Sequence, residues 1–109
     1  MTAQVRSFLY LQPRDGYRDA VVAFYREHRI IELAVERGLC CHGELVIPDD
    51  PDARLLVTCT WPSREAYAEW VENRPRGAEG LAEMLVLPEG GLPPGLLAEI
   101  AISTTSIDH

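Results

Sequence analysis

The feature that most constrains the fold is an apolar stripe that repeats with helical spacing between residues 17 and 37. Its positions follow alternating steps of four and three residues: Tyr17, Val21, Phe24, His28, Ile31 and Val35. Residues at this spacing share one face of an α-helix. Asp15 is suited to cap its start, and Gly38 is suited to end it in a left-handed conformation. The stripe therefore predicts one long surface helix over 17–37.

Segments rich in β-forming residues lie on both sides of this helix. The pattern predicts strands over 5–11, 39–47, 53–61 and 96–107. The polar, proline-containing segment 48–52 is short, so the second and third strands form an antiparallel hairpin. Ser63 is a natural N-cap for a second helix over 62–75. A shorter helix is expected over 76–87, followed by a loop.

This order of elements predicts a single α+β domain over residues 1–109. The fold class is the ferredoxin-like split βαβ arrangement, a four-stranded antiparallel sheet with helices on one face. Strand 5–11 carries Val5, Leu9 and Leu11 on one face, and Phe8 and Tyr10 on the other. Because the helices cover only one face, we expect a second copy to cover the other and form a two-fold homodimer.

Charge and composition exclude several classes of partner. The net charge of −7 disfavours binding to nucleic acid, because an acidic surface repels phosphate. No apolar run approaches the roughly 18 residues of a membrane span. The N-terminal segment lacks the pattern of a signal peptide, and three cysteines fit no secreted disulfide framework. We therefore expect a cytoplasmic protein with reduced thiols.

The segment 63–76 reads Ser-x-Glu-Ala-Tyr-x-x-Trp and then Asn-Arg-Pro-Arg. Together with Trp61 at the end of a strand and the order of elements, it resembles the antibiotic biosynthesis monooxygenase family, whose members are dimeric α+β barrels. The likeness extends from the first predicted strand to the last. Two departures stand out. Ala66 occupies a position where some members carry asparagine, and strand 5–11 has no asparagine, which disfavours the haem degradation of other members.

The resemblance implies a pocket between helices and sheet in each protomer. There, an aromatic polyketide of the anthrone or hydroquinone type would be oxidised by molecular oxygen during antibiotic biosynthesis. It also implies that no metal or flavin cofactor takes part, because the substrate carbanion itself reduces oxygen.

His28 is the first candidate for this chemistry, because it stands in the middle of the apolar stripe. A neutral imidazole can take a proton from a phenol or an activated methylene. The alternative is a core histidine satisfied by a carbonyl or a tyrosine hydroxyl. Tyr25, one turn earlier, is placed to orient the imidazole, and Phe24 is placed to line the pocket wall.

Trp70 and Tyr67 are the second group of candidates, since aromatic rings suit stacking on a flat substrate. Core packing is the alternative for both residues, and Trp61 is expected to be structural. Arg76 is a candidate for binding a substrate carbonyl, and His42 for a polar group in the pocket. The sequence Cys40-Cys41-His42 suggests a metal site only weakly, because ligands spaced along a strand are too far apart to hold one ion.

Two other functions remain open on the same scaffold. An oxygen-independent polyketide cyclase or isomerase would need the same pocket and a group for proton transfer. A small dimeric binding or accessory protein would have a filled core and no reaction.

Overall fold

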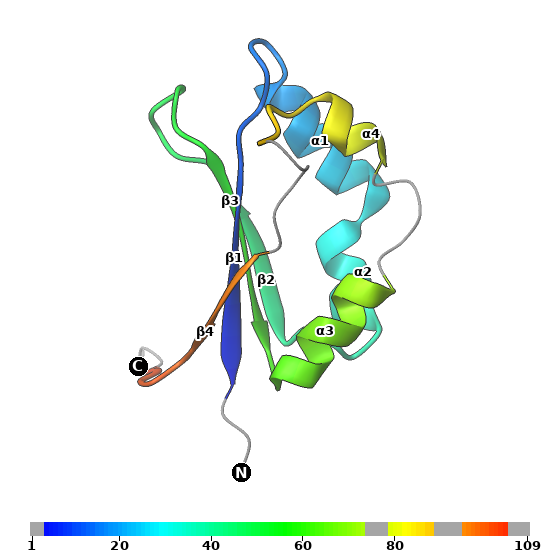
Figure 1. Cartoon of the computed structure of the whole chain (residues 1–109), viewed down its shortest axis with the longest axis vertical. Helices are drawn as coiled ribbons and strands as arrows, with labels where there is room; N and C mark the ends of the chain where they lie inside the picture. Colours follow the sequence, from blue (N-terminus) through cyan, green and yellow to red (C-terminus); the bar gives the residue numbers. More distant parts are fainter. Residues whose placement is uncertain (1–3, 74–78, 89–94, 105–109) are drawn as a thin grey trace, which may run out of the picture.

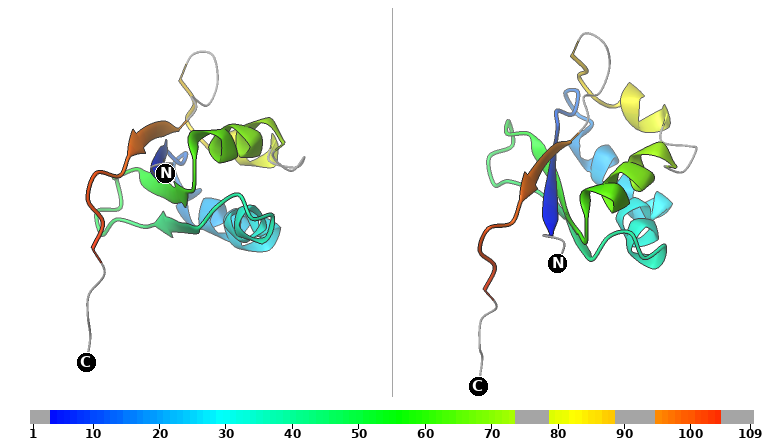
Figure 2. Two further views of the ribbon diagram at one scale, coloured as in Figure 1. Left: turned by 90° about the horizontal axis from the view of Figure 1, so that it is seen from below. Right: turned by 60° about the horizontal axis from the view of Figure 1, so that its bottom comes forward.

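The computed structural model describes residues 4–73, 79–88 and 95–104. It has the predicted ferredoxin-like α+β fold, with an antiparallel sheet in the order β2-β3-β1-β4. The strands are β1 (Val5–Leu11), β2 (His42–Val46), β3 (Leu55–Trp61) and β4 (Leu96–Glu99). The helices are α1 (Arg18–His28), α2 (Ile30–Glu36), α3 (Arg64–Glu72) and α4 (Glu79–Glu83). All of these helices lie on one face of the sheet (Figures 1 and 2).

The strands follow the predicted order. Some of them begin or end at other residues than predicted. β1 spans the predicted residues, and the β2–β3 hairpin is confirmed by the antiparallel pairing of Leu45 with Val57. β2 begins three residues late, because the N–H groups of Leu39 and Cys40 both bond to the Ala34 carbonyl at the end of α2.

The predicted strand 96–107 is too long at its C-terminal end. β4 stops at Glu99, which pairs with Val5, the first residue of β1, and one further bond joins the Ile100 N–H to the Gln4 carbonyl at 3.1 Å. Residues 101–104 run away from the sheet, as Figure 2 shows, and residues 105–107 lie outside the described part of the chain.

The prediction of one helix over 17–37 is wrong, because the helix is divided at Arg29. Arg29 has a left-handed backbone with φ 48° and ψ 45°, and it separates α1 from α2. A left-handed residue changes both the direction and the phase of a helix, so positions beyond it leave the original stripe. Ala34 is buried in α2, whereas Val35, which the stripe placed inside, is exposed. The predicted cap Asp15 is wrong too, because α1 follows Tyr17 without a side-chain cap.

Two glycines allow α2 to pack where it does. Gly38 has the predicted left-handed conformation after the helix, with φ +76°. Gly43, on β2, lies so close to α2 that a Cβ there would be 2.6 Å from Ile31 Cγ2 and 3.0 Å from the Cys59 sulfur. The absence of a side chain at Gly43 therefore lets α2 approach the sheet.

The helices α3 and α4 lie within the predicted segments 62–75 and 76–87, and each is shorter than its segment. Ser63 caps α3 as predicted, since its hydroxyl accepts a hydrogen bond from the Ala66 N–H at 3.1 Å. Residues 74 and 75 of the predicted helix lie outside the described residues, and the helix expected over 76–87 is the short α4. None of the helices in the described parts of the chain is long and apolar enough to cross a membrane.

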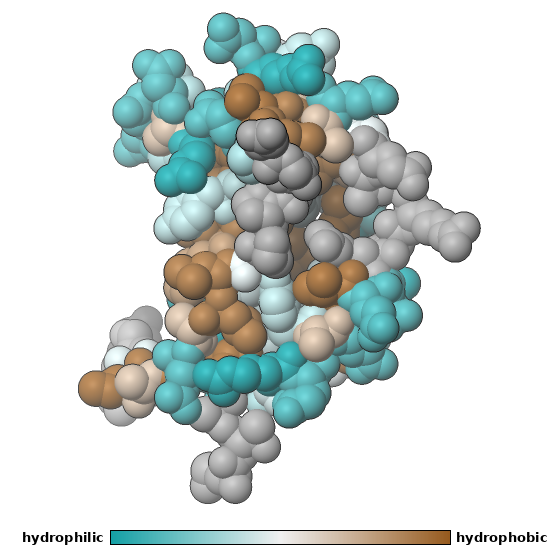
Figure 3. All heavy atoms as spheres, viewed as in Figure 1, coloured by the Kyte–Doolittle hydropathy of each residue, from teal (hydrophilic) through white to brown (hydrophobic). Residues whose placement is uncertain are grey.

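The face of the sheet without helices carries both apolar and polar side chains. Phe8, Tyr10 and Leu96 share this face, because directly paired residues in antiparallel strands point to the same side. Leu96 is 67 % exposed. In Figure 3, hydrophobic residues gather at mid-height on the left side of the molecule, where β4 lies in Figure 1. Thr58 is buried on this face, and its hydroxyl oxygen has no hydrogen-bond partner among the described residues.

The left-handed backbone of Gly38 gives a first prediction. Gly38→Ala should lower the free energy of unfolding by about 1 to 2 kcal/mol, because alanine pays the steric cost of that conformation. Gly38→Asn is the matched control and should lose less, since asparagine tolerates this conformation. Urea denaturation followed by circular dichroism measures both variants, and equal losses for Ala and Asn would contradict this account.

Candidate functional site

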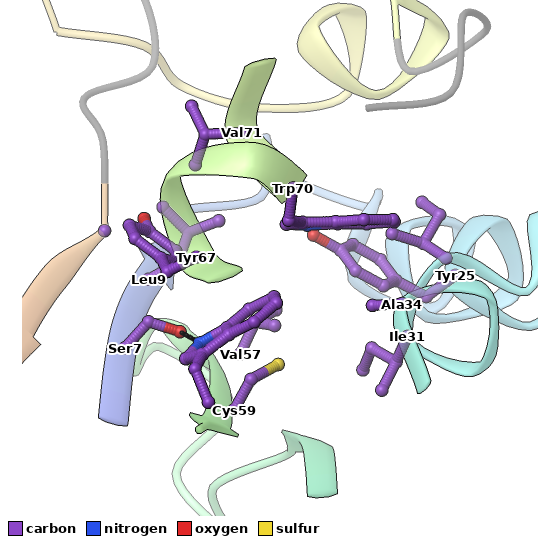
Figure 4. Close-up of a pocket in the computed structure, with 13 residues that line it drawn as sticks. Ser7, Leu9, Tyr25, Ile31, Ala34, Val57, Cys59, Tyr67, Trp70 and Val71 are labelled. Carbon is purple, nitrogen blue, oxygen red and sulfur yellow. Dashed lines mark hydrogen bonds between the residues drawn. The ribbon is translucent and has the colours of Figure 1, made fainter. Parts of the chain in front are cut away.

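A cavity of about 80 Å³ lies between the helices and the covered face of the sheet. β1 and β3 form its floor, α1 and α2 form one wall, and α3 covers it (Figure 4). Its lining residues are mostly apolar or aromatic: Ser7, Leu9, Tyr25, Ile30, Ile31, Ala34, Val57, Cys59, Trp61, Tyr67, Trp70, Val71 and Gly95. The predicted pocket between helices and sheet is therefore present, and it is small.

Three aromatic rings form one cluster at the cavity. The Trp61 ring meets Tyr67 edge to face, with ring centroids 5.2 Å apart, and lies 6.4 Å from Trp70 at a tilt of 35°. Trp61 is almost completely buried, with 1 % of its surface exposed. Such aromatic pairs add about 0.5 to 1.5 kcal/mol beyond the burial of their surface. The cluster therefore joins the end of β3 to the inner side of α3.

A buried hydrogen bond fixes the Trp61 ring against β1. The indole Nε1 of Trp61 donates to the Ser7 hydroxyl oxygen at 2.9 Å, the dashed line in Figure 4. Ser7 is itself buried. A serine hydroxyl can still donate its own hydrogen while it accepts this bond. The floor of the cavity thus holds one polar group in a defined position.

Tyr25 brings a second hydroxyl group to the cavity. Its side chain extends from α1, and its oxygen lies beside the Trp70 ring in Figure 4. The Tyr67 hydroxyl points toward β4 instead, and a Cβ on Gly95 would come within 2.9 Å of it. Ser7 and Tyr25 therefore offer hydroxyl groups inside the cavity, and Tyr67 offers mainly its ring.

Arg37 holds the end of α2 against α3. Its guanidinium carbon lies 5.5 Å from the centre of the Trp70 ring, and its Nη1 donates to the Asn73 carbonyl at 2.8 Å. A cation over an aromatic face is attracted by the electrons of the ring. Arg37 thus connects two walls of the cavity next to the ring that covers it.

Cys59 contributes a thiol to the cavity wall. Burial is the main cause that raises its pKa to about 12, and repulsion from Cys40 adds to the effect. The thiolate is therefore scarce at neutral pH, and Cys59 behaves as a small protonated group.

His28, the predicted base, is not at the cavity. It ends α1, is exposed to solvent, and stacks on the Phe24 ring with centroids 4.1 Å apart. The turn at Arg29 follows it directly, so the chain changes direction where the stripe predicted more inward-facing positions. The placement of His28 on the inward stripe is therefore wrong.

The other predicted site residues have different outcomes. Trp70 and Tyr67 line the cavity, and so does Tyr25, which was expected to orient the His28 imidazole. Phe24 is buried in the core and is not among the lining residues, although it faces α4, where a Cβ on Gly80 would be 3.3 Å from its ring. Arg76 lies outside the described residues.

His42 is exposed on β2, and its Nε2 lies 3.3 Å from a Glu44 carboxylate oxygen. The segment Cys40-Cys41-His42 was expected to lie along one strand, but the strand begins at His42 and Cys40 is buried in the preceding turn. Within the described residues, no group of three or more His, Cys, Asp or Glu side chains is placed to hold a metal ion.

Ser7 and Cys59, which carry a hydroxyl and a thiol at the cavity, were not among the predicted site residues. Ser7 interrupts the otherwise apolar face Val5, Leu9 and Leu11 of β1, and that interruption was a usable signal. Cys59 stands on the same face of β3 as Trp61 and was treated as an ordinary core residue. Trp61 itself is structural as expected, and it also lines the cavity.

Comparison with known proteins identifies a fold and no family. No protein-family model matches the chain, and no curated protein matches its sequence. Among solved structures, the haem-degrading protein Rv3592 of Mycobacterium tuberculosis, haem-free with cleaved protein, has the same fold. The match has a TM-score of 0.67 and 17 % identity, and it covers 97 % of this chain and 100 % of that one.

The same protein, MhuD, with two haems bound in its active site, matches with a TM-score of 0.58 and 19 % identity. That match covers 94 % of this chain and 99 % of the other. Likeness at this level of identity shows the fold alone.

The hydrogen bond between Trp61 and Ser7 gives a second prediction. Ser7→Ala should lower the free energy of unfolding by about 1 to 3 kcal/mol, because it leaves a buried indole N–H without an acceptor. Ser103→Ala, at an exposed position, is the control and should change stability by less than about 0.5 kcal/mol. Thermal or urea unfolding measures both, and equal stability of the two variants would contradict the proposed importance of this bond.

Proposed function

We propose that this protein is a cofactor-independent monooxygenase that oxidises a flat, electron-rich aromatic compound. The substrate class is the anthrone or hydroquinone type of polyketide intermediate in antibiotic biosynthesis. The observation that carries the proposal is the cavity itself, which combines the Trp61, Tyr67 and Trp70 rings with the hydroxyl groups of Ser7 and Tyr25. The shared fold with a haem-degrading protein supports oxygen chemistry on this scaffold.

The proposed chemistry uses the cavity to stabilise an anion of the substrate. The aromatic ring of the substrate lies against the tryptophan rings, and the Ser7 and Tyr25 hydroxyls donate hydrogen bonds to a phenolic or carbonyl oxygen. In a water-poor cavity, donors fixed in advance stabilise developing negative charge more effectively than water does. The substrate anion then reduces oxygen directly, without a metal or a flavin.

The size of the cavity sets a requirement on binding. A cavity of about 150 Å³ holds benzene, and ligand pockets generally measure about 300 to 1,000 Å³. The cavity of about 80 Å³ is smaller than either. A polycyclic substrate must therefore displace wall residues, and Ile30 and Ile31 on α2 and Tyr67 on α3 are among the bulky groups that border the cavity.

The cavity offers no strong base for proton abstraction. None of its described lining residues is His, Asp or Glu, and the Cys59 thiol is held protonated by burial. His28 lies outside the cavity and is not assigned this role. We propose that the acidic substrate loses its proton to bulk water and binds as the anion, while Ser7 and Tyr25 stabilise the anion and Trp70 holds the ring.

Oxygen consumption by the purified protein, with an anthrone and with a hydroquinone, tests this function. Oxygen uptake coupled to product formation supports the monooxygenase. Full turnover under anaerobic conditions would instead identify the oxygen-independent cyclase or isomerase. Saturable binding without any turnover would identify an accessory protein.

Haem is a second candidate substrate, because the two matching structures are of a haem-degrading protein. The cavity fits it poorly in both size and ligands, since no described lining residue is a histidine. We expect no stoichiometric haem complex when haem is titrated and followed by its absorption spectrum. If haem formed a tight complex and was then degraded when oxygen and a reductant were added, haem and not an aromatic polyketide would be the substrate.

The third prediction compares the contributions of Tyr25 and His28 to the reaction rate. Tyr25→Phe should lower kcat for the oxidation by about 10- to 100-fold, because it removes one donor to the substrate anion. His28→Ala is the matched control, since it changes a solvent-exposed residue at the end of the same helix. It should leave kcat within about twofold, and a larger loss in His28→Ala than in Tyr25→Phe would overturn the assignment.

We also propose that the protein acts as a homodimer through the helix-free face of the sheet. The exposed side chains of Leu96 and Tyr10 support this proposal, because a second copy would cover them.

The fourth prediction concerns this interface. The unchanged chain should run as a dimer in light scattering, and Leu96→Glu should shift it toward the monomer, because a charge would be buried between copies. Glu83→Gln, on the exposed side of α4, is the control and should stay dimeric. A monomeric unchanged chain would contradict the proposal.

A further inference from the structure

Two buried thiols lie next to each other beneath the cavity. Cys40 comes from the turn between α2 and β2, and Cys59 comes from β3. Both are free and buried. Besides burial, the electrostatic influence of the Cys40 thiol raises the pKa of Cys59, which also reflects how near the two thiols lie.

Gly43 leaves the space that the two sulfurs share. A Cβ at Gly43 would be 3.0 Å from the Cys59 sulfur and 3.6 Å from the Cys40 sulfur. Both sulfurs therefore border the same small region beside β2, which a side chain at position 43 would fill. Both sulfurs thus lie within 3.6 Å of one point, and a disulfide would form by movement of the two side chains toward it.

We propose that Cys40 and Cys59 are a latent redox pair, which hydrogen peroxide entering through the cavity converts into an intramolecular disulfide. Cys59 lines the cavity, whereas Cys40 lies behind it and is not among the lining residues. A cavity of about 80 Å³ admits molecules the size of water, and peroxide is only slightly larger. This inference does not rest on the proposed oxygenase activity.

The reaction follows from the nearness of both sulfurs to one point beside Gly43. The Cys59 proton passes to a Cys40 thiolate, and the resulting Cys59 thiolate attacks a peroxide oxygen. An S–O bond forms, the O–O bond breaks, and the departing hydroxide leaves as water with a proton from solvent. The Cys40 sulfur then attacks Cys59 Sγ: the S–S bond forms, the S–O bond breaks, and hydroxide takes the Cys40 proton as a second water. Two thiols are oxidised, and one peroxide is reduced to two waters.

Burial makes this oxidation slow at neutral pH and sensitive to pH. Burial raises the pKa of Cys40 and raises the pKa of Cys59 to about 12, so the thiolate that attacks peroxide is scarce. At pH values below the pKa of a thiol, each increase of one pH unit raises the fraction of thiolate tenfold. The rate of disulfide formation should therefore rise about 100-fold between pH 7 and pH 9.

Cys41 provides a control within the same chain. It is exposed and precedes β2, and its sulfur lies 3.9 Å from the Gln4 amide nitrogen. A bulky reagent such as oxidised glutathione should modify Cys41 and leave the buried pair reduced. Hydrogen peroxide should reach both, because it is small enough to enter the cavity.

The experiment treats the full chain with hydrogen peroxide and locates its disulfides by differential alkylation and peptide mass spectrometry. We expect a Cys40–Cys59 bond in the unchanged chain and in Cys41→Ser, and we expect none in Cys40→Ser or Cys59→Ser. Circular dichroism shows whether each variant is folded, and the map of the unchanged chain depends on no variant. The oxidised chain should also have a higher Tm than the reduced chain, reversed by dithiothreitol.

Three results would overturn the proposal. The first is a bond that joins Cys41 to Cys40 or to another molecule while Cys59 stays reduced in the folded chain. The second is oxidation of Cys59 to a sulfinic acid with Cys40 still a thiol. The third is a rate of Cys40–Cys59 bond formation that is the same at pH 7 and pH 9.

Discussion

The buried hydrogen bond from Trp61 to Ser7 is the interaction on which the rest of the site depends. It fixes the indole of β3 against β1, with Nε1 and Oγ 2.9 Å apart. From that position the ring meets Tyr67 and Trp70 and so positions α3 over the sheet. Removing the acceptor would leave a polar group buried in an apolar interior, which costs more than the bond contributes. The same bond therefore stabilises the fold and shapes the cavity floor.

The break at Arg29 determines which residues the cavity receives. A continuous helix would have placed Val35 in the core. With the left-handed Arg29, Val35 is exposed and Ala34 is buried. Ile30 and Ala34 line the wall together with Ile31, which stays inward as the stripe predicted, while His28 at the end of α1 is exposed. The resulting site has aromatic rings, hydroxyls and a protonated thiol in place of an imidazole. This composition favours stabilisation of a substrate anion over proton abstraction by the protein.

Local patterns predicted most of the fold, because they act over a few residues. Alternation located β1 and β3, Ser63 marked the start of α3, and Gly38 marked the end of α2. The break at Arg29 was not predictable, since arginine carries no signal for a left-handed backbone. The site depended on that break, so Trp70, Tyr67 and Tyr25 were placed correctly and His28 was not. Ser7 was visible as a polar interruption, but its partner Trp61 is 54 positions away in the chain.

The central claim is that the cavity under the tryptophan cluster binds a flat aromatic substrate. The chain has two tryptophans, so a ¹H–¹⁵N spectrum of the labelled protein contains two indole N–H signals. Addition of an anthrone should shift the Trp61 and Trp70 signals along saturable curves with one common Kd. The imidazole signals of exposed His28 should stay in place. Saturable binding that leaves both indole signals unchanged, or that shifts His28 alone, would contradict the claim.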